Sequence, residues 1–267
     1  LAGLTCAVNV EQLELVNRQG SRNVAAACAA MNESPTLVYV SSVAAAGPVR
    51  LGELLNESMR PHPVSDYGRS KLLGERAVQE FADRVPISIV RPAIVFGERD
   101  LALLELMKTI ITFRVVPAIG RTAPPTNLIY VHDLVQLLCS TVERGRRLAP
   151  EAEPASQQGI YFAASDEVVT LTELGQQLAE LLRPGRVTWT VPIPVLLARG
   201  VAACSEFVAA RRGQAAVLNR DKVREAVVPS WACSNQAAKC DLGFEPTGTV
   251  YEQLRTTVKW YRENDWL

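Results

Sequence analysis

Short apolar runs alternate with longer stretches of helical periodicity through the first two-thirds of the chain. The runs short enough for buried strands are residues 37–41, 87–90, 128–131 and 160–162. The stretches whose apolar spacing predicts helices are residues 11–30, 66–81, 101–113, 133–143, 171–182 and 250–262. Strands that alternate with helices are typical of βαβ units. We therefore expect an α/β protein built on a parallel sheet.

Three stretches fall outside this alternation. Residues 120–125 are rich in Gly and Pro, and residues 144–158 are charged and without periodicity, so both predict loops. Residues 192–210 form the most apolar long stretch, but Arg199 and Glu206 interrupt it. Either charge would be expensive at the centre of a bilayer, so no membrane span is predicted. A helix packed on the protein is favoured over one that lies flat on a membrane, and membrane association is not expected.

Composition narrows the class of protein. Hydrophobic residues make up 48% of the 267-residue chain and charged residues 21%, a profile typical of soluble globular proteins. The 28 basic and 28 acidic residues cancel, so no overall field favours binding to nucleic acid. The six cysteines lack CxxC spacing, and only two histidines are present. We expect reduced thiols, no metal site and a cytoplasmic location.

Candidate chemistry gathers at one end of the predicted sheet. Ser42 follows the strand predicted at residues 37–41, which puts a hydroxyl at the carboxyl edge where doubly wound folds bind ligands. Tyr67 and Lys71 lie four residues apart on a predicted helix and so share one face. A nearby ammonium lowers the pKa of a phenol, which prepares it for acid–base work.

Six segments in order resemble the extended short-chain dehydrogenase/reductases, a family that includes NAD-dependent epimerases, dehydratases and hydroxysteroid dehydrogenases. Residues 38–42 (VYVSS) with 67–71 (YGRSK) resemble the family's Ser–Tyr–Lys catalytic set. Also similar to the family are residues 17–21 (NRQGS), 89–97 (IVRPAIVFG), 128–134 (LIYVHDL) and 260–262 (WYR). The resemblance covers almost the whole chain.

The resemblance implies roles for particular residues. Tyr67 would be the catalytic acid and base, Lys71 would lower its pKa and bind the nicotinamide ribose, and Ser42 would orient the substrate. Asn17 would lie near the cofactor, although it could equally be an ordinary polar residue of its helix. The backbone at Pro92, Ala93 and Val95 would meet the nicotinamide carboxamide, with plain core packing as the alternative. Asp133 is expected to be the N-cap of its helix and His132 to be a local hydrogen-bonding residue.

The same resemblance implies a truncated Rossmann-like, doubly wound sheet. Residues 1–165 would form a partial dinucleotide-binding domain, from which 98–127 reach toward the substrate side, and residues 166–267 would form a smaller mixed α/β substrate-binding part. No two glycines lie closer than five residues, as in Gly47 and Gly52, so the glycine-rich loop that holds a dinucleotide is missing. We therefore expect the chain to begin near the family's fourth strand and to bind a dinucleotide poorly.

The implied activity is NAD- or NADP-dependent oxidoreduction or epimerisation at an alcohol or carbonyl centre. The small-molecule substrate would be a sugar nucleotide, a sterol-like compound or another alcohol or ketone, and a homodimer is possible within the family. Ser42 is followed by Val43-Ala44-Ala45-Ala46, which offers no acid for elimination, so a dehydratase is disfavoured. The competing hypothesis is a catalytically silent binding or regulatory protein, or an inactive fragment without the cofactor loop.

Overall fold

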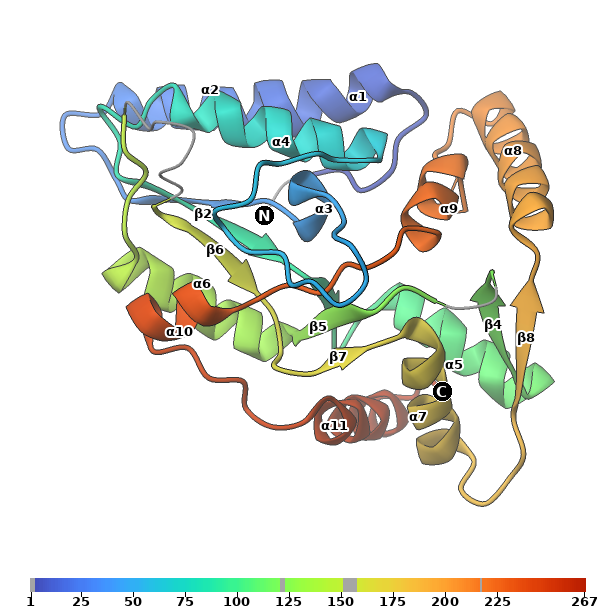
Figure 1. Ribbon diagram of the computed structural model, residues 1–267. Helices are drawn as coiled ribbons and strands as arrows, with labels where there is room; N and C mark the ends of the chain where they lie inside the picture. The colour runs from blue at the N-terminus through green and yellow to red at the C-terminus, as the bar shows by residue number, and fades with distance from the viewer. Residues whose placement is uncertain (1–2, 121–122, 151–157, 217) are drawn as a thin grey trace.

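A computed structural model describes residues 3–120, 123–150, 158–216 and 218–267, with a parallel sheet at its centre (Figure 1). The sheet runs in the order β1 (Leu37–Val40), β2 (Ile87–Pro92) and β6 (Ile160–Ala163), with β1 at its edge. Val40 pairs with Val90, and Arg91 with Phe162, so all three strands end at the same side. The α/β class and the parallel sheet are confirmed.

Helices cover both faces of this sheet because successive strand residues point to opposite sides. Ile87 and Ile89 of β2 pack with α2 (Ser21–Ala29) and α4 (Asp66–Gln79), whereas Val90 packs with α6 (Val131–Arg144) and α10 (Gln236–Leu242). All six positions of β2 are buried. The apolar run predicted at residues 87–90 therefore belongs to a strand that is covered on both sides, as a doubly wound sheet requires.

The first helix is interrupted by a wider turn. Residues 11–30 were expected to form one helix, and the chain is helical from Val10 to Ala29, but it divides into α1 (Val10–Glu14), the π-helical turn η1 (Leu15–Gly20) and α2. The single buried residue of η1 is Asn17. A π-helical turn adds a residue to the turn and redirects the side chains that follow, and such turns are frequent at functional sites.

A second small sheet lies beside the first. β3 (Ile94–Phe96) pairs in parallel with β5 (Thr126–Tyr130), and β7 (Val168–Val169) pairs antiparallel with β5. Its core is shared with three helices, which are α5 (Leu101–Phe113), α7 (Leu171–Leu182) and α11 (Val250–Glu263). The predicted bounds of α5 and α7 agree with the structure, and those of β5 are displaced toward the N-terminus by one or two residues.

The parallel pair formed by β4 (Val115–Ile119) and β8 (Trp189–Ile193) was not predicted. Proline occurs in both strands, at Pro117 and Pro192, and weakens the strand signal in the sequence. Because α5 and β4 pack with α7 and β8, residues 98–120 lie beside the C-terminal part. The domain division at residue 165 remains a prediction.

Helix α8 (Val195–Arg211) follows β8 and is less buried than its apolar sequence indicates. It was expected to pack on the protein, and it does so against α9 (Arg220–Ala226) through Ala198 and Ala202, which are its only buried side chains. Within the described part of the chain, no helix is both long and apolar enough to cross a bilayer. The loop expected at 144–158 begins where α6 ends, but residues 151–157 lie outside the described residues, as do 121–122 of the loop at 120–125.

Candidate active site

Ser42 stands where the chain leaves β1 and begins the short helix α3 (Val43–Ala46). Its hydroxyl accepts a hydrogen bond from the amide of Ala44 at 3.2 Å, which makes it the N-cap of α3. The four residues of α3 are buried, so they fix the position of the cap. The sequence prediction that a hydroxyl occupies the carboxyl edge of the sheet agrees with this position.

Gly68 brings helix α4 close to α3. A Cβ atom at position 68 would lie 2.3 Å from the carbonyl oxygen of Ala44, closer than real Cβ atoms come to any such atom, so only glycine permits this approach. Tyr67 is the residue before it, and its hydroxyl lies close enough to Ser42 for that side chain to lower the pKa of the phenol. The serine and tyrosine of the predicted catalytic set are therefore in contact because two backbones meet at a glycine.

The pKa of Tyr67 is raised above its ordinary value. Burial is the main cause, since it penalises the phenolate, and the negative charge of Glu225 acts in the same direction. The side chain of Ser42 opposes both but does not outweigh them. We expected Lys71 to lower this pKa toward neutrality. In the structure burial is stronger, and Tyr67 is a neutral phenol at physiological pH.

Lys71 lies one helical turn after Tyr67 with only 7% of its surface exposed. Its ammonium donates a hydrogen bond to the carbonyl of Val40 at 2.7 Å and lies 4.7 Å from the centre of the Tyr39 ring. Burial lowers the pKa of Lys71 to about 8, while the carboxylate of Glu75 partly offsets that effect. The amine is thus directed at the end of β1, where it can change partners and protonation state near neutral pH.

A buried ion pair lies beside Lys71, and the sequence did not predict it. Arg91 at the end of β2 donates to Glu75 at 2.7 and 2.9 Å, and Ser41 donates to the same carboxylate at 2.5 Å. Arg91 and Glu75 are almost fully buried. The signal was present for Glu75, because Tyr67, Lys71 and Glu75 recur every four residues along one face of α4.

Asn17 ties the N-terminal segment to α4. Its side-chain amide donates to the carbonyl of Leu4 and to the hydroxyl of Ser70, at 2.8 and 2.9 Å, and its oxygen accepts from the amide of Leu4. Both N–H groups are used in these contacts. Asn17 therefore lies near the candidate site, where it holds the chain around it, and direct contact with a cofactor remains a prediction.

The other three predicted cofactor residues occupy different environments. Pro92 ends β2, and Ala93 donates its amide to the carbonyl of Ala163, so both lie at the carboxyl edge beside Ser42. The side chain of Ala93 packs with α3 in the core. Val95 belongs to β3 and is exposed. The structure thus brings Pro92 and Ala93 to the edge that carries Ser42, with a packing role for the Ala93 side chain.

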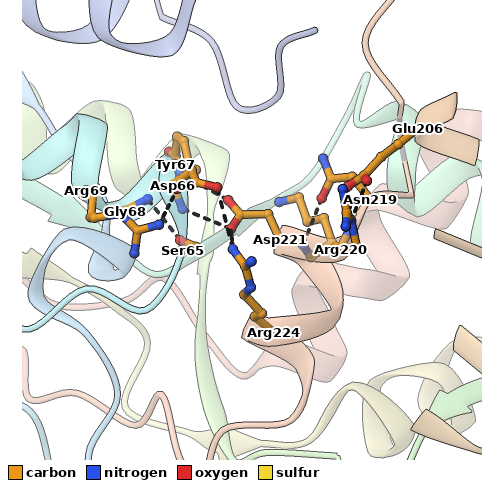
Figure 2. Close-up of polar contacts among 11 residues, drawn as sticks. Ser65, Asp66, Tyr67, Gly68, Arg69, Glu206, Asn219, Arg220, Asp221 and Arg224 are labelled. Atoms are coloured by element: carbon orange, nitrogen blue, oxygen red, sulfur yellow. Dashed lines mark hydrogen bonds and ion pairs between the residues drawn. The ribbon is translucent and has the colours of Figure 1, made fainter. Parts of the chain in front are cut away.

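A carboxylate from the far end of the chain completes the first turn of α4. Asp221, on α9 (Arg220–Ala226), accepts the backbone amides of Asp66 and Tyr67 at 2.9 and 3.1 Å. Ser65 accepts the next amide, that of Gly68, at 2.9 Å. Figure 2 shows Asp221 beside the start of α4, with Arg224 below, which pairs with both Asp221 and Asp66. The free amides at the start of a helix need such partners, and here most come from another element.

Two further side chains of α9 face Tyr67. The ammonium of Lys222 lies 5.8 Å from the centre of the Tyr67 ring and 3.7 Å from the carboxylate of Glu225. Burial raises the pKa of Glu225, whose charge in turn raises that of Tyr67. Sequence reasoning could not find these residues, because more than 150 positions separate them from Tyr67 and no local pattern connects them.

Two cavities flank the first turn of α4. One, of about 670 Å³, follows β1 and is lined by Ser41, Tyr67 and Lys71 together with residues of η1. The other, of about 530 Å³, lies between residues 5–13, Asp66 and the helices α8 and α9. We call them the β1 cavity and the α8 cavity. Thr5 lines both, so the two cavities adjoin at this residue.

His132 and Asp133 have structural contacts. His132 pairs with Glu98 at 3.2 Å, and the buried Asp133 accepts hydrogen bonds from Thr247 and Gln253, which fix the chain before α11. Asp133 lies inside the first turn of α6, so the expectation that it is the N-cap is wrong. Across the described residues, no three His, Cys, Asp or Glu side chains gather as metal ligands would.

Comparison with known proteins identifies the type of chain. A family model described as the RmlD substrate binding domain matches residues 5–238. The N-acetyl-α-D-glucosaminyl-diphospho-ditrans,octacis-undecaprenol 4-epimerase of Escherichia coli O157:H7 is 31% identical over 129 residues, which are 46% of this chain and 38% of that enzyme. The matched stretch is thus less than half the length of the curated relative.

Solved structures agree with the fold. UDP-glucose 4-epimerase from Thermotoga maritima, solved with UDP-glucose, superposes with a TM-score of 0.74 at 19% identity, over 99% of this chain and 76% of that one. UDP-glucuronic acid 4-epimerase from Bacillus cereus, in complex with UDP-glucuronic acid and NAD, gives 0.71 at 15% identity, over 99% and 74%. At these identities the likeness establishes the Rossmann-like architecture.

Proposed function

The chain belongs to the RmlD substrate binding domain family of the extended short-chain dehydrogenase/reductases, and on that premise we propose that it acts in NAD- or NADP-dependent oxidoreduction or epimerisation at an alcohol or carbonyl centre. The observation that carries the proposal is the contact between Tyr67 and Ser42 at the rim of a cavity that Lys71 also lines. Contact between these groups at the carboxyl edge of a parallel sheet is what proton transfer to a carbonyl requires.

The protonation states of Tyr67 and Lys71 support the roles that we propose for them. The raised pKa of Tyr67 keeps its phenol neutral, so it can donate a proton to a carbonyl oxygen that becomes an alcohol. Ser42 would hold that same oxygen by a hydrogen bond. In the reverse direction Tyr67 must accept a proton, and a charged Lys71, with its pKa of about 8, would stabilise the phenolate when the amine turns from Val40 toward the phenol.

The β1 cavity fits one end of the cofactor. Tyr67 and Lys71 line it and offer a phenol and an amine suited to a nicotinamide and its ribose. A bound dinucleotide would supply the hydride acceptor or donor. No glycine-rich loop suited to its diphosphate occurs in residues 1–267. The fit therefore extends to the nicotinamide end, and weak dinucleotide binding by this stretch of chain remains our expectation.

We propose that the substrate extends from Tyr67 into the α8 cavity, with its reacting carbon beside the phenol and its remaining groups in the cavity. This cavity adjoins Asp66, next to Tyr67, and Arg220 and Asn219 contribute polar groups to its wall. Relatives act on or bind sugars joined to a diphosphate, either a nucleotide sugar or an undecaprenyl diphosphate sugar. We therefore propose a sugar diphosphate as the substrate class, which narrows the earlier range of sugar nucleotides, sterols and other alcohols or ketones.

One feature favours a second candidate function. The lack of any two glycines closer than five residues fits a catalytically silent member that binds a ligand but transfers no hydride. Substitution of the phenol separates the two hypotheses. An active enzyme depends on the Tyr67 hydroxyl, whereas a binding protein retains its ligand affinity without it.

The test is Tyr67→Phe, assayed with NAD or NADP against UDP-glucose, UDP-glucuronic acid and the N-acetylglucosaminyl undecaprenyl diphosphate. We expect turnover to fall by at least about a hundredfold, since general acid–base groups contribute on that order, with dinucleotide affinity nearly unchanged. Tyr251→Phe, on the exposed face of α11, is the matched control. Equal turnover in Tyr67→Phe and the control would contradict the proposed mechanism.

A further inference from the structure

One edge of the molecule carries an unusual share of exposed apolar side chains. The end of α5, the pair β4 and β8, and helix α8 lie along this edge (Figure 1). Phe113 is 70% exposed, Trp189 68% and Leu196 82%. The other large exposed apolar residues of this edge are Ile111, Val187, Val191, Leu197, Val201, Phe207 and Val208. We call these ten residues the apolar edge.

Helix α8 contributes to this edge because it packs on the protein by its smallest residues. Ala198 and Ala202 are buried against Val223 of α9, while Leu197, Val201 and Val208 recur at helical spacing on an exposed face. An amphipathic helix of a globular protein normally has the opposite arrangement, with its large apolar residues inward. The outward apolar face therefore indicates a surface that another partner covers.

The charge of this edge identifies the partner. Residues 183–214 hold five arginines, namely Arg183, Arg186, Arg199, Arg211 and Arg212, against one acidic residue, whereas the whole chain is neutral. That acid, Glu206, is already paired with Arg220. Arg114 lies close enough to Arg183 to act on its pKa, which desolvation and the charges of Arg114 and Arg186 lower. Among the described residues these five arginines form no ion pair, and arginines beside aromatic and aliphatic groups suit an anionic bilayer surface.

We propose that the apolar edge docks this protein onto an anionic phospholipid membrane, with α8 lying in the plane of the surface. A second copy of the chain fits less well, because a symmetric contact would bring the same arginines of both copies together. The arrangement is interfacial, since Arg199 and Glu206 interrupt the apolar stretch of α8. This inference revises our expectation of no membrane association and goes beyond the proposed function.

The docking surface adjoins the α8 cavity. Phe207, a member of the apolar edge, also lines that cavity, together with Ala203 and Ala210 of the same helix. A docked α8 would therefore place the mouth of the cavity at the lipid headgroups. A sugar diphosphate on a lipid carrier could then enter without leaving the membrane, which is a consequence that rests on the proposed function.

The experiment is co-sedimentation of the full chain with vesicles, and it needs no enzymatic activity. Vesicles of phosphatidylcholine alone are compared with vesicles that contain about a third phosphatidylglycerol. We expect binding to the anionic vesicles, weaker binding as salt rises, and a blue shift of fluorescence that Trp189→Ser removes. The double variant Arg183→Gln/Arg186→Gln should lose about fivefold in partition coefficient per arginine. Leu196→Gln/Leu197→Gln should lose at least about tenfold.

Matched controls are Arg50→Gln and Leu51→Gln, which remove a similarly exposed arginine and leucine elsewhere on the surface and should bind as the unmodified chain does. Circular dichroism of each variant checks that it is folded. Failure to bind anionic vesicles, or equal losses in edge and control variants, would overturn the proposal. A dimer that Leu196→Gln/Leu197→Gln dissociates, without any vesicle binding, would instead assign the edge to a second copy.

Discussion

Burial moves the pKa values of Tyr67 and Lys71 in opposite directions, and both shifts favour the uncharged form. The phenol loses its proton only above its ordinary range, and the ammonium loses its proton near pH 8. This follows from the cost of placing either charge in a poorly hydrated site. Tyr67 and Lys71 can therefore exchange a proton with a ligand, because a bound ligand would change the electrostatic field at both groups.

Lys71 should make the stability of the fold depend on pH. Its pKa is lowered from 10.5 to about 8 on folding, so between these values the unfolded chain holds a proton that the folded chain has lost. Stability contributed by this group therefore rises with pH across that window, by up to about 3 kcal/mol. Urea unfolding of Lys71→Met, followed from about pH 7 to pH 10, should show this rise removed.

The comparison variant is Lys259→Met, because that lysine is exposed on α11. Its stability should follow the pH profile of the unmodified chain. Parallel profiles for all three proteins would show that the amine of Lys71 is hydrated in solution.

Gly68 and Gly200 make a matched pair of helical glycines. A Cβ at position 68 would meet the Ala44 carbonyl oxygen at 2.3 Å, whereas one at position 200 meets nothing within 4 Å. Gly68→Ala should therefore force α3 and α4 apart and destabilise the fold by about 1–3 kcal/mol. Gly200→Ala should stabilise α8 by about 0.5–1 kcal/mol. Thermal unfolding measures both, and equal shifts of the same sign would contradict the close approach of the two helices.

At the scale of elements, the first turn of α4 depends on α9. Asp221 accepts the amides of Asp66 and Tyr67, so Asp221→Asn should weaken two charge-assisted hydrogen bonds. With a cap worth about 1 kcal/mol, we expect amide hydrogen exchange at these two positions to rise about fivefold. Exchange-detected mass spectrometry of the α4 peptide measures the effect. Asp83→Asn, in an exposed pair with Arg84, is the control and should leave that peptide unchanged.

The sequence predicted the elements whose hydrophobic pattern is long and regular. Helices α5 and α7 begin and end at the predicted residues, and β1 and β2 differ by one or two. It did not predict α3, whose four residues are too few for a periodic signal, or β4 and β8, which contain proline. The π-helical turn at η1 was not predicted either, and its buried Asn17 contacts Leu4 and Ser70, which lie 13 and 53 positions away in the sequence.

At the scale of the whole molecule, some residues of the candidate site could be predicted from the sequence and others could not. Ser42, Tyr67 and Lys71 lie within 30 positions and carry a family motif, so the sequence was sufficient to find them. Arg91, Asp221 and Glu225 reach the site only through the packing of separate elements, and α9 in particular comes from the C-terminal part. Contacts of this kind depend on the tertiary fold and leave no local trace.

Thr5 is common to the lining of the two cavities. Its neighbour Leu4 accepts a hydrogen bond from the side-chain amide of Asn17, which also donates to Ser70 on α4. A shift of Thr5 that widens one cavity would narrow the other. Binding of a ligand in one cavity would then reduce the volume left for a ligand in the other, so each ligand would lower the affinity for the other.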